Sequence, residues 1–241
     1  MARAAATAVL VIGMSTAAYA GPPYLTDDPV PTDYRHWEIY VFNGGERLGS
    51  AFDDDVGLDL NYGATENVQL TATIPTSFAR ESRGAERFGT GDVEVGIKYR
   101  FVKDESNGLS ASIFPRVILP TSSLATHDRV KLLLPLWIGK DFDGGTSVFG
   151  GGGYEFNPGP GNRNFWQAAV AVTKDVSKKV SLGAELTEQG PDASSGTSQT
   201  RAGLGGIVKL SGPSSLLLSA GPTWSDHKSG YHFYAALGLN F

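Results

Sequence analysis

Charged or titratable side chains recur at alternate positions along much of this chain. Alternation places successive side chains on opposite faces of a β-strand, so these residues would share one face of each segment. Acids and bases are both present, and across a narrow passage they could form a transverse field that selects small polar or aromatic solutes. The candidate lining residues are Asp59, Asp92, Glu94, Lys98, Arg100, Arg116, Lys131, Glu155, Glu185, Arg201, Lys209 and His232.

The same residues could instead pair with one another to satisfy buried charge. Glu94 with Arg116, and Glu185 with Arg201, are pairs that neighbouring strands could bring together. One network could serve both purposes, so selection of a solute and simple charge pairing both remain open.

Catalysis is poorly supported by the residues that could perform it. A hydrolase needs a nucleophile, a base and an orienting group within reach of one another. The chain has no Gly-x-Ser-x-Gly motif, and its four histidines, His36, His127, His227 and His232, lie before the first strand, in loops, or on an inward face. Cysteine is absent, which excludes thiolate metal sites and disulfides. We therefore expect no enzymatic activity and no cofactor.

The elements that must position these side chains are strands. From Trp37 onward about twelve segments alternate between apolar and polar or small residues, at about the length expected of membrane barrel strands. They run over residues 37–43, 55–63, 68–76, 91–101, 109–120, 130–140, 146–156, 165–173, 180–187, 200–210, 215–223 and 231–241. The pattern predicts an all-β fold, namely a transmembrane antiparallel up-and-down β-barrel of about twelve strands.

The last segment, Tyr231 to Phe241, shows the alternation most strictly. One face carries only apolar or aromatic side chains and the other carries small or polar ones. We expect this strand to close the barrel by pairing with the Trp37 strand, so that no edge is exposed to lipid. The terminal Phe241 resembles the C-terminal signature of bacterial outer-membrane barrels, which implies the barrel-insertion machinery as a partner.

Connection lengths and aromatic positions favour a membrane barrel over a soluble sandwich. Short connections follow the even strands and longer ones, such as 44–54 and 77–90, generally follow the odd strands, as periplasmic turns and external loops would. Aromatic residues sort into two belts, which is what the two interfaces of a bilayer predict. We expect the Gram-negative outer membrane, with both termini periplasmic.

The N-terminal region divides into two parts. Residues 1–20 read as a signal peptide ending at Ala18-Tyr19-Ala20, and residues 21–35 form an extended, proline-rich arm before a barrel over residues 36–241. The arm could fold into the lumen as a plug or remain a disordered leader. Without Arg3, 19 of the 20 Lys+Arg remain against 25 Asp+Glu, a charge of −6 with no basic patch for nucleic acid.

Several motifs resemble one known family. The arm Pro22-Pro-Tyr-Leu-Thr-Asp-Asp-Pro29 with Trp37-Glu38, the stretch Gly89 to Phe101, and Pro115-Arg-Val-Ile-Leu-Pro-Thr121 are similar to the MetA-pathway of phenol degradation family. The resemblance implies an outer-membrane barrel, often described as a transporter, with a link to uptake of aromatic compounds. It implies no catalytic or binding residues.

We therefore expect a passive channel for small, aromatic or hydrophobic molecules, with outer-membrane lipid and a small-molecule solute as partners. A structural or adhesion barrel with a blocked lumen is one alternative, and a lipid-modifying enzyme is another. Pro115 and Pro135 fall mid-strand on neighbouring segments, where each removes a ladder donor. A kink there could narrow the lumen or open the wall, or it could be a tolerated irregularity.

Overall fold

Fourteen β-strands make up the ordered framework of the chain. The computed structural model describes residues 23–80, 85–124, 129–226 and 228–241, so the predicted signal peptide and the loop histidines His127 and His227 lie outside it. Among the described residues, no helix has the length and apolarity needed to span a bilayer. The strands are β1 (Trp37–Leu48), β2 (Ala51–Thr65), β3 (Val68–Arg80), β4 (Glu86–Thr90), β5 (Val93–Asp104), β6 (Leu109–Ile113), β7 (Arg116–Leu119), β8 (Lys131–Phe142), β9 (Thr146–Phe156), β10 (Phe165–Asp175), β11 (Val180–Gln189), β12 (Gln199–Lys209), β13 (Ser214–Ser225) and β14 (Lys228–Asn240).

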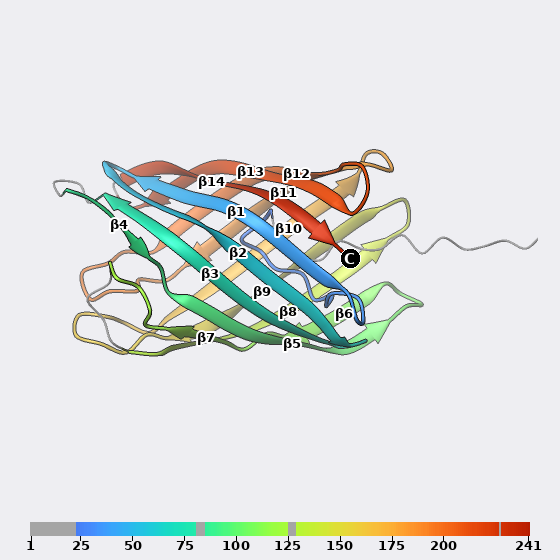
Figure 1. Ribbon diagram of the computed structural model, residues 1–241, viewed down its shortest axis with the longest axis horizontal. Helices are drawn as coiled ribbons and strands as arrows, with labels where there is room; N and C mark the ends of the chain where they lie inside the picture. The colour runs from blue at the N-terminus through green and yellow to red at the C-terminus, as the bar shows by residue number, and fades with distance from the viewer. Residues whose placement is uncertain (1–22, 81–84, 125–128, 227) are drawn as a thin grey trace, which may run out of the picture.

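The strands form one closed antiparallel sheet (Figure 1). The last strand, β14, pairs with β1 over eleven residue pairs, from Glu38 opposite Asn240 to Leu48 opposite Gly230. The backbone N–H of Trp37 donates to the Phe241 carbonyl at 2.7 Å, and the N–H of Phe241 donates back at 3.0 Å. This pairing satisfies the backbone at the seam and confirms the predicted closure.

The fourteen strands fill twelve strand positions around the barrel, and we call each position a stave. β4 and β5 both pair with β3 and follow one another in a single barrel strand. Between them, at Gly91–Asp92, this strand has one residue more than β3, which makes a bulge opposite Pro75. The N–H of Gly91 donates to the Pro75 carbonyl at 3.1 Å, so the bulge does not interrupt the wall. β6 and β7 form another stave, and the two mergers reduce fourteen strands to the predicted twelve.

Pro115 interrupts its strand without opening the wall. The segment predicted over 109–120 is divided into β6 and β7 because proline has no N–H to donate. The registers on either side still agree, since Ile113 lies opposite Leu136 and Arg116 lies opposite Leu133 on β8. The Phe114 N–H donates to the Pro135 carbonyl at 3.1 Å, so the interruption is local.

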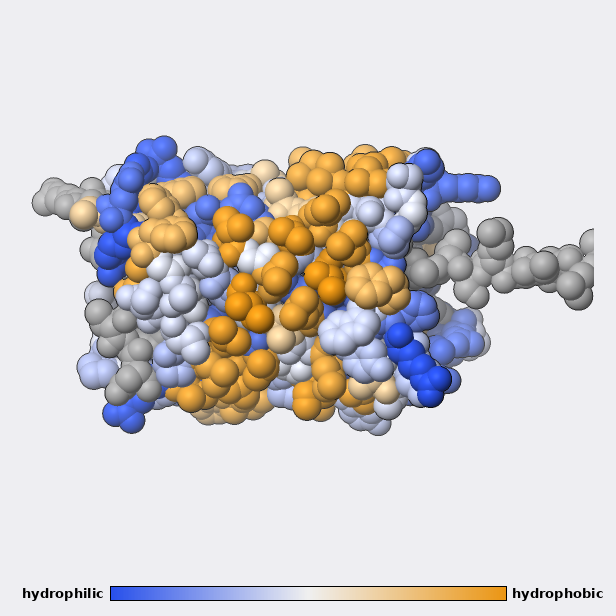
Figure 2. Space-filling view, in the orientation of Figure 1, coloured by the Kyte–Doolittle hydropathy of each residue, from blue (hydrophilic) through white to orange (hydrophobic). Residues whose placement is uncertain are grey.

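The outer wall is an apolar band between two aromatic belts. Space-filling side chains show the band across the middle of the barrel and polar residues at both ends (Figure 2). The exposed aromatic residues at the end that carries the C-terminus include Trp37, Tyr99, Phe101, Phe142 and Phe241, and those at the opposite end include Phe88, Tyr154, Phe156, Trp166, Trp224 and Tyr231. This distribution fits a bilayer crossed by tilted strands.

The two ends of the barrel differ in their connections. We call the end with Trp37 and Phe241 the terminal end and the other the loop end. Connections at the terminal end are short, and those over 120–130, 157–164 and 190–198 at the loop end are longer, as predicted. The predicted loops 44–54 and 77–90 are wrong in extent. β1 and β2 extend into the first and leave only Gly49 and Ser50 as the turn, while β3 and β4 cover 77–80 and 86–90 of the second. Gly49 has a φ of 63°, which glycine adopts without strain.

Candidate functional site

The N-terminal arm lies inside the barrel. In Figure 1 its ribbon runs within the ring of strands. Thr26, Asp28, Pro29 and Thr32 are buried, although no strand includes them. Prolines suit this position because they restrict φ and remove N–H donors that would otherwise need partners in the interior. The arm, defined here as residues 23–36, therefore occupies part of the lumen.

Side chains from the barrel wall hold the arm along its length. Lys98 on β5 lies 2.9 Å from the Asp27 carboxylate and donates to the Asp28 carbonyl at 3.0 Å. Only 2% of the Lys98 side chain is exposed, so its charge is satisfied by the arm and not by solvent. Phe114 adds a cation–π contact, with its ring centroid 5.1 Å from the ammonium.

Polar contacts continue on both sides of this ion pair. Glu185 on β11 accepts hydrogen bonds from the N–H and the hydroxyl of Thr26, each at 3.0 Å. Gln69 on β3 accepts hydrogen bonds from the N–H and the hydroxyl of Thr32, at 2.8 and 3.1 Å. The arm thus touches opposite parts of the ring of strands, which fixes it across the lumen.

Two glycines make room for this arrangement. A Cβ on Gly63 would lie 1.9 Å from the Asp33 carbonyl oxygen, where the arm passes the terminal end of β2. A Cβ on Gly183 would lie 2.5 Å from the Tyr24 hydroxyl. Burial and the nearby Glu185 carboxylate raise the pKa of Tyr24 to about 12, so its hydroxyl stays protonated near neutral pH.

A chamber with a volume of about 540 Å³ lies between the arm and the loop end. Its floor includes Pro23, Tyr24 and Leu25 of the arm, and its lower wall carries large apolar side chains. The wall residues are Phe42, Leu133, Trp137 and Tyr234. Leu25 is 56% exposed and Trp137 only 2%, so the arm presents an open apolar side chain to the chamber, whereas the indole is packed into the wall.

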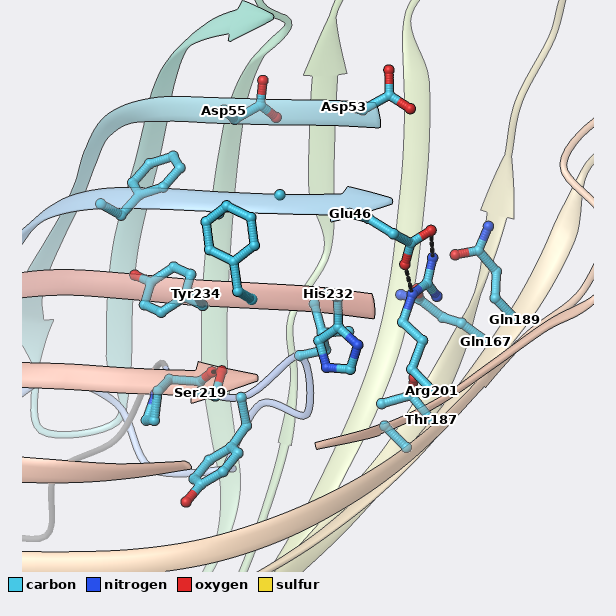
Figure 3. A pocket seen from close by; sticks show the side chains of 18 of the residues that line it. Glu46, Asp53, Asp55, Gln167, Thr187, Gln189, Arg201, Ser219, His232 and Tyr234 are labelled. Atoms are coloured by element: carbon cyan, nitrogen blue, oxygen red, sulfur yellow. Dashed lines mark hydrogen bonds and ion pairs between the residues drawn. The ribbon is translucent and has the colours of Figure 1, made fainter. Parts of the chain in front are cut away.

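An ion pair lines the upper chamber. Arg201 on β12 makes two hydrogen bonds to the Glu46 carboxylate on β1, from Nε to Oε2 and from a terminal nitrogen to Oε1 at 3.3 Å (Figure 3). Their side chains are 15% and 23% exposed. β13 and β14 separate β12 from β1 in the sheet, so this pair bridges non-neighbouring strands on one side of the barrel. Its planar, bidentate form is the strongest arrangement for this charge pair.

A second set of ion pairs lines the opposite wall. Arg116 lies 3.1 Å from Glu94, as the sequence predicts, and Lys131 lies 3.7 Å from Asp92. The predicted pairing of Glu185 with Arg201 is wrong. Arg201 reaches Glu46 instead, and the Glu185 carboxylate faces Thr26 of the arm.

The structure separates the predicted lining residues into groups. Arg116, Arg201 and His232 line the chamber, while Lys98 and Glu185 contact the arm below it. Asp92, Glu94 and Lys131 belong to the ion pairs of the opposite wall. Asp59 accepts from Asn61 at 3.2 Å, and Glu155 lies opposite Leu133 and Phe165. Arg100 bonds Asn67 and the Glu66 carbonyl, and Lys209 lies opposite Ser215, both at the terminal end.

Several chamber residues were missed from the sequence. Glu46 fell in a predicted loop, because its glycine-rich surroundings hide the end of β1. Trp137 belongs to the apolar run Leu132 to Ile138, in which both faces of β8 are hydrophobic, so alternation could not show which side faces inward. That continuous run was the available signal for an apolar inner wall.

Hydrogen bonds link Thr223, His232 and Glu46 in the upper chamber. His232 Nδ1 lies 3.2 Å from the Thr223 hydroxyl, and that hydroxyl donates to Glu46 at 3.2 Å. The carboxylate thus contacts the hydroxyl and not the imidazole, which is the reverse of a nucleophilic triad. Among the described residues, no group of three or more His, Cys, Asp or Glu could hold a metal ion.

Comparisons with known proteins agree with this architecture. Residues 38–241 match the sequence model of a family described as "Putative MetA-pathway of phenol degradation". No curated protein matches the chain.

Solved structures show the same fold at low sequence identity. The COG4313 outer membrane channel from Pseudomonas putida F1 is 12% identical with a TM-score of 0.71, over 92% of this chain and 100% of that one. The KdgM porin is 11% identical with a TM-score of 0.56, over 82% and 97%. The CymD monoaromatic hydrocarbon channel is 8% identical with a TM-score of 0.51, over 87% and 88%.

Proposed function

The chain belongs to the MetA-pathway of phenol degradation family, and from that premise we propose that it is a passive channel for small molecules in the Gram-negative outer membrane. The chamber carries this proposal. Its volume of about 540 Å³ can hold a small solute, it lies between the arm and the loop end, and it combines apolar with polar walls. Ligand sites in proteins have the same mixture of a concave apolar surface and a few directed polar groups.

The direction of the barrel follows from its connections. Outer-membrane barrels have short turns in the periplasm and longer loops outside. On this basis the terminal end is periplasmic, and the chamber opens toward the outside of the cell. A solute entering from outside would reach the chamber first and meet the arm second.

The arm then controls whether a solute can pass from the chamber to the periplasmic end of the barrel. It is held by the Lys98–Asp27 ion pair and by hydrogen bonds to Gln69 and Glu185. Further hydrogen bonds run from Ser219 to the Pro23 carbonyl and between Arg35, His36 and Gly63, but over residues 23–36 the only strand-type pairing is the bridge between Tyr34 and Gly63. Displacement of the arm would join the chamber to the periplasmic mouth.

The solved neighbours with channel titles support the choice of a small-molecule channel. One of them is named for monoaromatic hydrocarbons, and the chamber here has Phe42, Trp137 and Tyr234 in its wall. We therefore propose aromatic or hydrophobic compounds as the solute class, with outer-membrane lipid around the barrel. The function is not enzymatic on this account.

One other function has an observation in its favour. The arm crosses the lumen, which is what a structural or adhesion barrel with a blocked lumen would also have. Solute flux separates the two. Purified protein in liposomes should admit small solutes at rates above those of protein-free liposomes. Absence of flux for every solute in a panel, with the protein folded, would favour the blocked barrel.

A further inference from the structure

Two glutamines lie side by side on the inner wall of the chamber. Gln167 on β10 is directly opposite Gln189 on β11, and both side chains line the chamber. The Cβ atoms of directly opposite residues are about 4.5–5.5 Å apart, so the two amides can reach one bound group together. Figure 3 shows them on the side of the chamber away from Tyr234. We call these two side chains the amide pair.

The fold does not use the amide groups of this pair. Within the part of the chain that the structure describes, the side chains of Gln167 and Gln189 make no hydrogen bond to the protein. Gln199, which continues the same cross-strand row on β12, differs because its amide oxygen accepts a hydrogen bond from Arg201. A glutamine amide has two N–H donors and a carbonyl acceptor. The amide pair therefore presents both kinds of group to the chamber.

A third polar side chain beside the amide pair also lacks a partner. Thr187 is two residues from Gln189 on β11, so both side chains point to the same face of the sheet. Thr187 lines the chamber and is only 7% exposed, yet its Oγ1 has no hydrogen-bond partner among the described residues. Buried polar atoms are nearly always satisfied, so this hydroxyl indicates that a bound molecule or water completes the site.

Aromatic rings face the amide pair from across the lumen. Phe42 on β1 and Tyr234 on β14 are stacked, with ring centroids 6.1 Å apart and an angle of 12° between the ring planes. β10 is five staves from β1 in the ring of twelve, so Phe42 and Gln167 lie on nearly opposite walls of the same chamber. An aromatic body can pack against these rings while a polar group at its other end reaches the amide pair.

The hydrogen-bonding capacity of the amide pair matches one polar group best. A carboxamide has two N–H groups and a carbonyl oxygen, so it can donate to both glutamine carbonyls and accept from one of their N–H groups. A hydroxyl has a single hydrogen and can donate to only one of the two carbonyls. An ether or ketone oxygen donates to neither. Polar atoms left without a partner cost free energy, which favours the carboxamide.

We propose that the amide pair, with Thr187 beside it, is a subsite for the carboxamide group of a small aromatic solute whose ring packs against Phe42 and Tyr234. This inference rests on the proposed channel function and adds its substrate class. Arg116 Nε is another donor in the chamber lining without a partner among the described residues, but its stave lies three positions from β10. A solute held at Arg116 would not depend on the glutamines, so glutamine variants separate the two sites.

Binding of three uncharged probes tests the subsite without any current. The full-length protein in detergent would be titrated by calorimetry with benzamide, benzyl alcohol and toluene. Benzamide should bind about tenfold more tightly than toluene, as two net hydrogen bonds would give, and benzyl alcohol should lie between them. Equal affinities for benzamide and toluene, or tighter binding of toluene, overturn the inference.

Three variants with the same substitution locate the effect. Methionine keeps the length of glutamine and removes the amide, so Gln167→Met and Gln189→Met should each weaken benzamide binding about fivefold, the loss expected for one hydrogen bond. Neither change should weaken toluene binding. Gln199→Met is the matched control, because that amide belongs to the same row but is held by Arg201 and is not part of the chamber lining. Its benzamide binding should equal that of the parent.

Three results would contradict the assignment. They are unchanged benzamide binding in Gln167→Met and Gln189→Met, an equal loss in Gln199→Met, and an equal loss for toluene. Folding of each variant is checked by the mobility shift of unheated protein on a gel.

Flux of benzamide into liposomes separates the subsite from the channel. Flux into liposomes that carry the protein, combined with benzamide binding that does not depend on Gln167 or Gln189, keeps the channel and overturns the subsite. Binding that depends on both glutamines, with no flux of any solute, keeps the subsite and contradicts the channel.

Discussion

The Lys98 ammonium lies 2.9 Å from the Asp27 carboxylate inside the barrel, and this ion pair joins the arm to strand β5. Removing one partner of a buried pair leaves the other charge without compensation. Lys98→Met should therefore lower stability by roughly 3 kcal/mol and release this part of the arm. Stability is measured as the temperature of prior heating at which the protein no longer runs at its folded mobility on a gel. Release of the arm is measured by its proteolysis.

A matched control exists at the barrel surface. Lys103 forms an ion pair with Glu105 at 2.7 Å, but both side chains are exposed. Exposed pairs contribute only about 0–1 kcal/mol. Lys103→Met should leave both stability and arm proteolysis near those of the parent. An equal response of the two variants would show that the loss of any lysine matters, and not the loss of the Lys98–Asp27 ion pair.

The close approach of Gly63 to the arm gives a second prediction. A Cβ at this position would collide with the Asp33 carbonyl, so Gly63→Ala should destabilise the full chain. The same substitution should cost much less in a chain that lacks residues 23–33, because the colliding atom is gone. The thermal stabilities of the parent, Gly63→Ala, the chain lacking residues 23–33 and the combination of both changes form a double-mutant cycle. A cost that does not depend on the arm would place the strain in the sheet instead.

The Glu46–Arg201 pair gives a third prediction. Glu46→Gln or Arg201→Met should each lower thermal stability, and the double variant should lose less than the sum of the two. The physical reason is that either single change leaves one mostly buried charge unpaired. Strict additivity in the cycle would mean that the two groups do not stabilise each other.

Phe241 gives a fourth prediction, for the partner expected from the C-terminal residue. Its side chain is 59% exposed on the outer wall, so little packing depends on it. Phe241→Ala should slow assembly in cells through loss of recognition by the barrel-insertion machinery, and unassisted folding into detergent should be unchanged. Phe101→Ala, which removes another exposed ring from the same belt, is the control. Equal assembly rates for both variants would argue against a special role for the terminal residue.

Alternation was enough to predict the barrel, its closure and the number of its staves, because every strand has one lipid-facing and one inward face. Strand ends were harder. Glu46 was missed since glycines around it resemble a loop, although backbone pairing with β2 and β14 continues past it.

The contents of the lumen were the least predictable part. The prolines showed that residues 21–35 would be extended but could not show where they would lie. The position depends on distant partners such as Gln69, Lys98 and Glu185, which no local pattern connects to the arm. For the same reason, no local pattern shows that Arg201 pairs with Glu46, beyond β13 and β14, and not with Glu185 on the adjacent strand.

The arm is the centre of this account, and single-channel conductance with and without it is the most direct test. The purified full-length protein in planar bilayers should show small or infrequent openings, and a chain lacking residues 23–33 should conduct several-fold more. That result would establish a channel narrowed by its own N-terminal arm. Equal conductance would contradict the arm's role, and absence of conductance from both folded proteins would contradict the channel itself.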